Sequence, residues 1–360
     1  MIRISRKSIL ERIDWMYDLA LRHGQYYGSP EAQLARTRYH ARHPTAIVAM
    51  KCMDGRLNLS VVTNTPPGII QPFRNLGGQF DLGWPHLGEL LTSYVQSVAA
   101  TGRRVLILIN YHFSKGDVQR GCAGFGYDTA AAIAHAYDIQ RQISYTFGSG
   151  HTTVYPLVCG LETDENALIV HGSNGSRLEL AGLDEADKAS FDARLIDLCP
   201  DMPARIREDL VPLLAGNLDY LLQLRQETAA GIPPVLDIEH CEWMICLGRG
   251  FDFLHTPNLA LIIGPYSPNL EEPIRKAAAI IENNMAEGRI PDDGILLLAS
   301  VPYTDLGVDR ARAELKSRFL AGFGTDVIRR ASPWLADRLH VHTAVLDWRS
   351  QTLERLAEAV

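Results

Sequence analysis

The sequence lacks several features that would restrict its class. It contains no stretch of about 18 consecutive apolar residues, so we expect no membrane-spanning helix. Its first residues, MIRISRKSILERIDW, carry charges every few positions and lack the apolar run of a signal peptide, so we expect a cytoplasmic location. Basic residues do not predominate, since the net charge is −7, and neither nucleic acid nor a membrane is expected as a partner.

Cysteine is also scarce. Six cysteines in 360 residues are too few for a disulfide scaffold, and in a reducing compartment they are expected to bind metal or to fill the core. What is present is ordinary for a soluble globular protein with a large core, with 46% hydrophobic and 21% charged residues. The length is sufficient for about two domains.

The order of apolar patterns predicts an α/β fold. Short apolar runs at 46–50 and 105–109 are typical of buried parallel strands. Apolar residues at helical spacing predict helices over 87–99 and 130–143. Strand, helix, strand and helix in this order favour a parallel sheet flanked by helices. Residues 1–43 have helical patterns and are expected to form an arm.

Similar patterns return in the second half of the chain. An apolar run occupies 243–246, a helical stripe 274–285 and a second apolar run 295–299. Cys246 lies 194 positions after Cys52 (246 − 52), and Ile295 lies 190 positions after Val105 (295 − 105). Near-constant offsets predict an internal duplication, with chance repetition of common α/β elements as the alternative.

Candidate metal ligands follow the first two predicted strands. Cys52 comes directly after the first strand and His112 just after the second, with Cys122 nine residues further on. The carboxyl ends of parallel strands share one edge of a sheet, where α/β proteins place their sites. Two thiolates and an imidazole suit Zn²⁺, and three protein ligands leave a fourth position for a water that becomes hydroxide near neutral pH.

Asp54 and Arg56 complete this group. The carboxylate can accept a hydrogen bond from bound hydroxide, and the guanidinium can hold that carboxylate in a two-pronged pair. If the pair breaks, Asp54 is itself a candidate fourth ligand. Taken singly, each residue has a structural interpretation as a core cysteine, a hydrogen-bonded histidine or a turn. The combination favours a metal site.

The chain resembles a known family at these residues. Cys52-Met53-Asp54-Gly55-Arg56 matches the Cys-x-Asp-x-Arg signature of β-carbonic anhydrases, and Arg74-Asn75-Leu76-Gly77-Gly78 is similar to that family's Arg-Asn-Ala-Gly segment. His112 and Cys122 would supply the two remaining ligands. Most members have only two residues between them. The longer gap, the run around Cys122 and the segment from Gly160 to Asp164 are similar to the carboxysome shell branch, which carries a degenerate second catalytic domain.

The resemblance implies a zinc-dependent, reversible hydration of CO2 to bicarbonate and a proton, with Asp54 and Arg56 as catalytic residues and one Zn²⁺ per chain. It implies a β-carbonic-anhydrase-like sheet with a degenerate second copy. The expected division is a helical arm (1–43), a catalytic zinc domain (44–198), a helical connector (199–232) and a non-metal-binding repeat (233–360). A homo-oligomer, a dimer or larger, is expected.

Three alternatives accompany this interpretation. Shell-branch enzymes carry a sizeable region ahead of the catalytic domain, whereas the motif here begins at Cys52, so a carboxysome is the alternative to a cytoplasmic location. The same site suits hydrolysis of carbonyl sulfide or carbon disulfide. A non-catalytic zinc-binding assembly or regulatory protein, in which Asp54 closes the metal site, is the alternative from another class.

Overall fold

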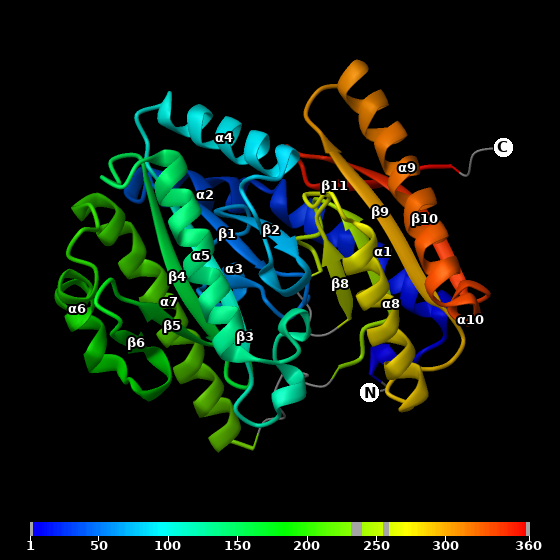
Figure 1. Ribbon diagram of the computed structural model, residues 1–360, viewed down its shortest axis with the longest axis horizontal. Coiled ribbons are helices and arrows are strands. Elements are labelled where there is room, and N and C mark those ends of the chain that lie inside the picture. Colours follow the sequence, from blue (N-terminus) through cyan, green and yellow to red (C-terminus); the bar gives the residue numbers. More distant parts are fainter. Residues whose placement is uncertain (1–2, 232–239, 255–258, 358–360) are drawn as a thin grey trace. The chain divides into compact units, whose positions relative to one another are not determined.

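The computed structural model describes residues 3–231, 240–254 and 259–357 (Figure 1). The expected domain boundary at 232–233 lies outside these residues. The chain divides into two compact units, which we call the central unit (Leu34–Cys52 and Leu57–Ile238) and the terminal unit (Met1–Gln33, Met53–Arg56 and Glu239–Val360). Within the described ranges, no helix combines the length and the apolarity needed to cross a membrane.

The central unit contains a six-stranded sheet in the order β2-β1-β3-β4-β5-β6. Its first four strands are parallel, and β5 and β6 are added antiparallel at one edge. Every residue of β1 is buried, as the apolar run at 46–50 predicts. The predicted strand at 105–109 is confirmed within β3. The bounds are β1 Ala46–Cys52, β2 Ile70–Asn75, β3 Val105–Phe113, β4 Val154–Glu162, β5 Ala167–His171 and β6 Arg177–Glu179.

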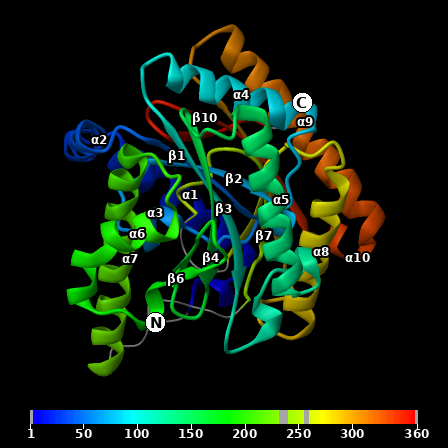
Figure 2. The ribbon, with the colours of Figure 1, turned by 60° about the vertical axis from the view of Figure 1, so that its left-hand side comes forward.

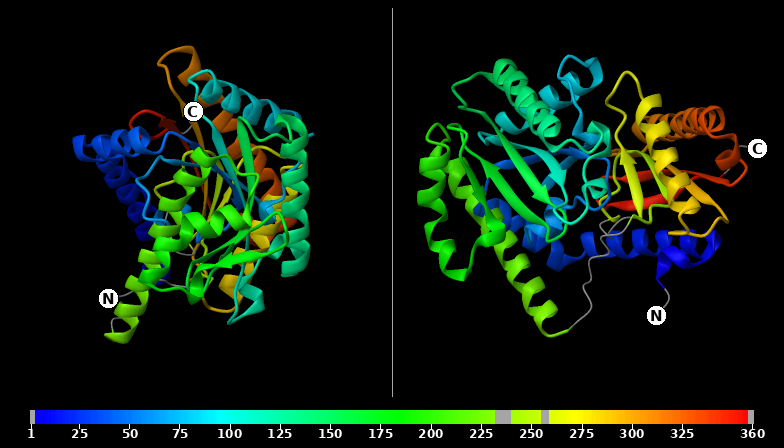
Figure 3. Two further views of the ribbon diagram at one scale, coloured as in Figure 1. Left: turned by 90° about the vertical axis from the view of Figure 1, so that its left-hand side faces the viewer. Right: turned by 60° about the horizontal axis from the view of Figure 1, so that its bottom comes forward.

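Helices cover both faces of this sheet. Figures 2 and 3 show α4 and α5 against one face and α7 on the other. The helices predicted over 87–99 and 130–143 are confirmed as α4 and α5. Asp128 caps α5 by accepting hydrogen bonds from the backbone N–H groups of Ala130 and Ala131, at 2.8 and 3.1 Å. The bounds are α3 Leu59–Val62, α4 Pro85–Ala99, α5 Thr129–Phe147, α6 Phe191–Leu198 and α7 Ala204–Ala229.

The terminal unit contains a second sheet of five strands in the order β11-β10-β9-β7-β8. Strands β7 to β10 are parallel, and β11 pairs antiparallel with β10. The apolar runs at 243–246 and 295–299 lie in or beside β7 and β9, where they are buried. The bounds are β7 Met244–Gly248, β8 Ala260–Ile263, β9 Ile295–Tyr303, β10 Leu339–Asp347 and β11 Thr352–Arg355.

The helices of the terminal unit include the amino-terminal one. The expected helical arm consists of α1 (Ile9–Tyr27) and α2 (Pro30–Arg42), and the right panel of Figure 3 shows α1, in blue, beside the strands of this unit. Arg12 of α1 is fully buried, where it pairs with Asp293 and lies 5.1 Å from the ring centre of Trp243. The other helices are α8 Glu271–Ala286, α9 Val308–Ala331 and α10 Pro333–Ala336. The protein is therefore a mixed α/β protein with two sheets of mostly parallel strands flanked by helices.

Candidate metal centre

The structure brings together the three candidate ligands that the sequence indicates. Cys52 is the last residue of β1, and His112 is the last but one of the neighbouring parallel strand β3, so both lie at the carboxyl edge of the sheet. The loop between β3 and α5 supplies Cys122. One ligand atom from each residue lies within 4.8 Å of the other two, and all three residues are buried.

The chemistry of this group suits a bound cation. Among the described residues, neither ring nitrogen of His112 has a hydrogen-bond partner, although the residue is only 2% exposed. Unpaired polar atoms at such burial are costly. A hydrogen bond with Cys122, together with burial, raises the pKa of the Cys52 thiol well above its ordinary value. A metal ion would take up the imidazole lone pair and stabilise both thiolates, so the residues fit Zn²⁺.

Two glycines allow the Cys122 loop to approach the turn after β2. Gly77 has a φ of +65°, and a Cβ on Gly124 would lie 2.6 Å from the Cα of Gly77, closer than any side chain could be. The side-chain amide of Gln79 donates to the carbonyl of Gly124 at 2.9 Å. The Gly77-Gly78 segment, which resembles the family motif, therefore packs directly against the loop that carries Cys122.

Two carboxylates, one on the last residue of β4 and one just after it, bind the backbone and side chains of the segment between His112 and Cys122. Asp164 accepts hydrogen bonds from the Ser114 hydroxyl at 2.7 Å and from the Gly116 backbone at 2.6 Å. Glu162 accepts one from the Lys115 backbone at 3.1 Å. From sequence, the segment from Gly160 to Asp164 was notable only as a resemblance. The structure shows that it orders the long loop that carries Cys122.

Asp54 and Arg56 form a buried ion pair within the terminal unit. The Nη2 and Nε atoms of Arg56 donate to Oδ2 of Asp54 at 2.7 and 3.0 Å, and the Arg56 backbone N–H donates to Oδ1 at 2.9 Å. The two residues are 6% and 8% exposed. This is the two-pronged pair expected from their spacing.

Strand β8 binds the backbone of this segment. The N–H of Ile262 donates to the carbonyl of Met53 at 2.7 Å, and the N–H of Gly55 donates to the carbonyl of Ala260 at 3.1 Å. These two bonds flank an antiparallel bridge between Asp54 and Leu261. No local signal could have predicted the contact, because Leu261 lies 207 positions after Asp54 (261 − 54).

A histidine that sequence analysis missed lies in the field of this ion pair. The Nδ1 atom of His240 is 2.9 Å from Oε1 of Glu242, whose other oxygen accepts from Asn284 at 2.9 Å. Burial alone would lower the pKa of His240, but Glu242 outweighs it and the pKa is raised, with smaller opposing effects from Arg56 and Asp54. In the sequence, the only sign of this pairing was that His240 and Glu242 are two positions apart.

Comparison with known proteins adds to this geometry. Residues 46–181 match the sequence model of a family described as the carboxysome shell carbonic anhydrase, catalytic domain. Over these residues the chain is similar to this family. The carboxysome shell carbonic anhydrase of Hydrogenovibrio crunogenus is 30% identical over 270 residues, which are 66% of this chain and 49% of that protein. The chain therefore spans about half the length of that relative. The part that matches the carboxysome shell carbonic anhydrase model contains all three candidate ligands, Asp54 and Arg56.

Proposed function

We propose that the chain catalyses the reversible hydration of CO2 to bicarbonate, with one Zn²⁺ held by Cys52, His112 and Cys122. The observation that carries this proposal is the buried Cys–His–Cys group at the carboxyl ends of β1 and β3, inside the segment that matches the catalytic domain of the related family. Bound Zn²⁺ would act as a Lewis acid and lower the pKa of a coordinated water to about 7, which provides a nucleophile at neutral pH.

Within this proposal Asp54 orients the nucleophile and Arg56 positions Asp54. An ionised carboxylate has about four lone-pair sites. Arg56 donates to both oxygens, from its backbone N–H and from Nε and Nη2 of its side chain, and so fixes the direction in which the carboxylate faces. The same pair keeps the carboxylate from becoming a fourth metal ligand. The intact pair therefore argues against the non-catalytic alternative.

We also propose that residues 233–360 form a degenerate repeat. In each unit a central strand pairs in parallel with two neighbours, Ile47 with Ile70 and Leu106, and Met244 with Ala260 and Leu296. Placing Met244 on Ile47 gives an offset of 197 (244 − 47). Both flanking strands then have the same offset of 190 (260 − 70 and 296 − 106). Any other placement would also give them one shared offset, because the flanking strands lie 36 positions apart in each unit (106 − 70 and 296 − 260). This equal separation supports a duplication.

This register changes which residue corresponds to Cys52. The sequence spacing paired it with Cys246, whereas the placement of Met244 on Ile47 puts Arg249 there (52 + 197) and Pro302 opposite His112 (112 + 190). The strand pairings require the offset of the central strand to exceed that of its neighbours by seven, because the chain from the central strand to its first partner strand spans 16 positions in the second unit (260 − 244) and 23 in the first (70 − 47). The sequence offsets of 194 and 190 differ by only four.

The loop that carries Cys122 has no counterpart in this alignment. Helix α9 begins five positions after β9 (308 − 303), whereas α5 begins 16 positions after β3 (129 − 113). With an arginine, a proline and a missing loop at the three ligand positions, the proposed repeat cannot form a zinc site of this kind. One zinc per chain follows from the proposal. A homo-oligomer of two or more chains and a cytoplasmic or carboxysomal location stay predictions.

Metal analysis and a stopped-flow CO2 hydration assay test the proposal together. The wild-type chain should contain one zinc and be active. Cys52→Ser and His112→Ala should lose both zinc and activity, since a three-ligand site rarely tolerates the loss of one ligand. Cys159→Ser is a matched control, because Cys159 is a buried strand cysteine outside the ligand group. Full activity in a zinc-free variant would refute the catalytic proposal, and two zincs per chain would refute the degenerate repeat.

A further inference from the structure

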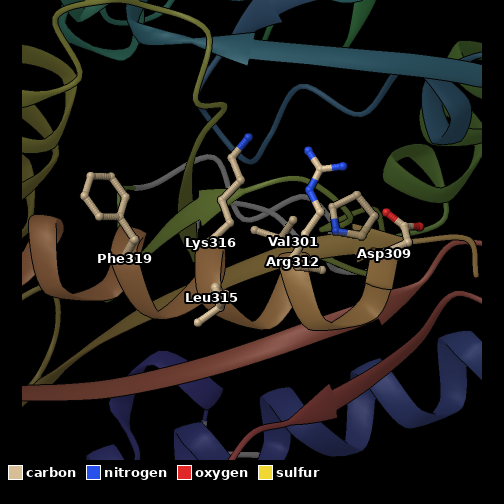
Figure 4. A pocket seen from close by; sticks show the side chains of 8 residues that line it. Val301, Asp309, Arg312, Leu315, Lys316 and Phe319 are labelled. Atoms are coloured by element: carbon tan, nitrogen blue, oxygen red, sulfur yellow. The ribbon is translucent and has the colours of Figure 1, made fainter. Parts of the chain in front are cut away.

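A groove of about 500 Å³ lies in the terminal unit, between the end of β9 and helix α9 (Figure 4). Val301 and Pro302, near the carboxyl end of β9, form part of its lining, and α9 supplies the rest. The carboxyl edge of a parallel sheet is where α/β proteins most often bind ligands. The lining residues are Val301, Pro302, Asp309, Arg312, Ala313, Leu315, Lys316 and Phe319.

Cationic side chains converge on this groove. Arg312 and Lys316 are four positions apart on α9 and so lie on one helix face, and Figure 4 shows both extending in the same direction. Arg249 follows directly on the end of β7 and is not among the lining residues, but its charge acts on Lys316. Partial burial of the ammonium group, followed by the charges of Arg249 and Arg312, lowers the pKa of Lys316. The three like charges are therefore close enough to repel one another.

No carboxylate neutralises these cations directly. Among the described residues, Arg249, Arg312 and Lys316 have no carboxylate oxygen within 4.0 Å. Other arginines of the same helix are paired, as Arg310 is with Glu314 at 3.0 Å and Arg329 with Asp326 at 3.0 Å. The unpaired cations are thus a local feature of the groove.

Asp309, the acidic residue of the groove, accepts hydrogen bonds from the backbone N–H groups of Thr304 and Asp305, at 2.7 and 3.3 Å. These bonds lower the pKa of its carboxyl group, and the charge of Arg312 lowers it further. Arg249 lies 5.2 Å from the ring centre of Trp348, and its Nε atom is buried without a hydrogen-bond partner in the described part of the chain. An oxyanion that reaches Arg249 would supply the acceptor that this N–H lacks.

The place of the groove in the proposed repeat agrees with this. In the strand alignment, Arg249 stands where the central unit has Cys52, and Pro302 stands where it has His112. The groove is then the counterpart of the candidate metal centre.

We propose that this groove binds a small oxyanion, a phosphate or a carboxylate, through Arg312 and Lys316, with Arg249 near enough for its charge to contribute. Guanidinium groups donate two parallel hydrogen bonds to such anions, and the lysine adds a compact charge. Anion binding by the terminal unit does not depend on the proposed carbonic anhydrase activity.

Inorganic phosphate is the first probe, titrated into the full-length zinc-loaded chain and followed by calorimetry and by the fluorescence of Trp348. The double variant Arg312→Ala, Lys316→Ala should bind phosphate about tenfold or more weakly, the effect of losing charge-assisted hydrogen bonds. Arg329→Ala, Arg330→Ala removes two charges from the same helix and should bind normally. Trp348→Phe should abolish the fluorescence change and leave the heat of binding.

The double variant also reports on charge crowding without any ligand. In phosphate-free buffer its Tm should equal or exceed that of the wild type, because two repelling charges have been removed. Competition by bicarbonate would identify the product of the proposed reaction as the occupant. Phosphate binding without such competition would point to a phosphorylated compound. Absence of phosphate binding to the wild type, or equal binding by the double variant, would overturn the proposal.

Discussion

The substitution Gly55→Ala separates the role of the ion pair from the role of the metal ligands. Gly55 is not among the residues with positive φ, so alanine can adopt its backbone conformation. Space is the only obstacle, since a Cβ would lie 2.7 Å from the carbonyl oxygen of Ala260. To reach 3.0–3.4 Å, the segment has to move by 0.3 to 0.7 Å (3.0 − 2.7 and 3.4 − 2.7).

The size of the effect follows from this movement. Two backbone hydrogen bonds join the segment to β8, and loss of both would cost about 2 kcal/mol of unfolding free energy at a net ~1 kcal/mol each. Misplacement of a catalytic group by 1 Å can cost about 100-fold in rate, so a shift of about half that size should lower kcat about tenfold. Zinc should be retained, because Cys52, His112 and Cys122 all belong to the central unit.

Stopped-flow CO2 hydration, zinc analysis and thermal unfolding would be measured on the same preparation. Gly322→Ala is the matched control in the same unit, because nothing lies within 4 Å of the Cβ it would add in helix α9. That substitution should leave kcat unchanged and raise stability by up to ~1 kcal/mol. An unchanged kcat in Gly55→Ala would refute the positioning role of β8. Loss of zinc would show that the segment and the ligands are not separable.

Three further predictions address neighbouring residues. Asp54→Asn should keep zinc and lose most turnover, because the residue orients the nucleophile and does not hold the metal, so a near-normal rate would refute its role. Asp164→Ala should free Ser114 and Gly116 and weaken zinc binding about tenfold or more, as loss of supporting contacts does at other metal sites. His240 has a folded-state pKa above its ordinary 6.5, so its pairing with Glu242 stabilises the fold fully below that value and is lost as pH rises through the folded-state pKa. The Tm difference between wild type and His240→Asn should therefore be larger at acidic than at alkaline pH, and a constant difference would contradict the pairing.

The strands that the sequence predicted are all largely buried, although the equally buried β4, whose run is interrupted by Pro156 and Gly160, was missed. Strands β1, β3, β7 and β9 have continuous apolar runs because both faces of their sheets are covered. Strand β10 was missed because much of it is only half-buried and it carries His340, His342 and Thr343. Helix α9 was also missed, since Leu315 and Phe319 face outward and weaken its apolar stripe.

The candidate ligands could be predicted because their positions depend on strand order alone. Cys52 and His112 lie at the ends of neighbouring parallel strands, and any parallel pairing of β1 with β3 brings them together. The groove of α9 depends on which charges lack partners, which spacing does not reveal. The proposed correspondence of the two units involves a seven-residue difference in the length of chain between the first two paired strands (23 − 16), which only the strand register shows.

The segment that carries Asp54 directly follows one of the candidate ligands in the sequence. Met53–Arg56, however, belongs to the terminal unit, while Cys52, the residue directly before it, belongs to the central unit. An edge strand that offers one N–H and one carbonyl at the spacing of Met53 and Gly55 fixes the backbone on both sides of Asp54. Since an orienting carboxylate is effective only when it is held in place, we expect this strand to support the proposed role of Asp54 without contributing a ligand.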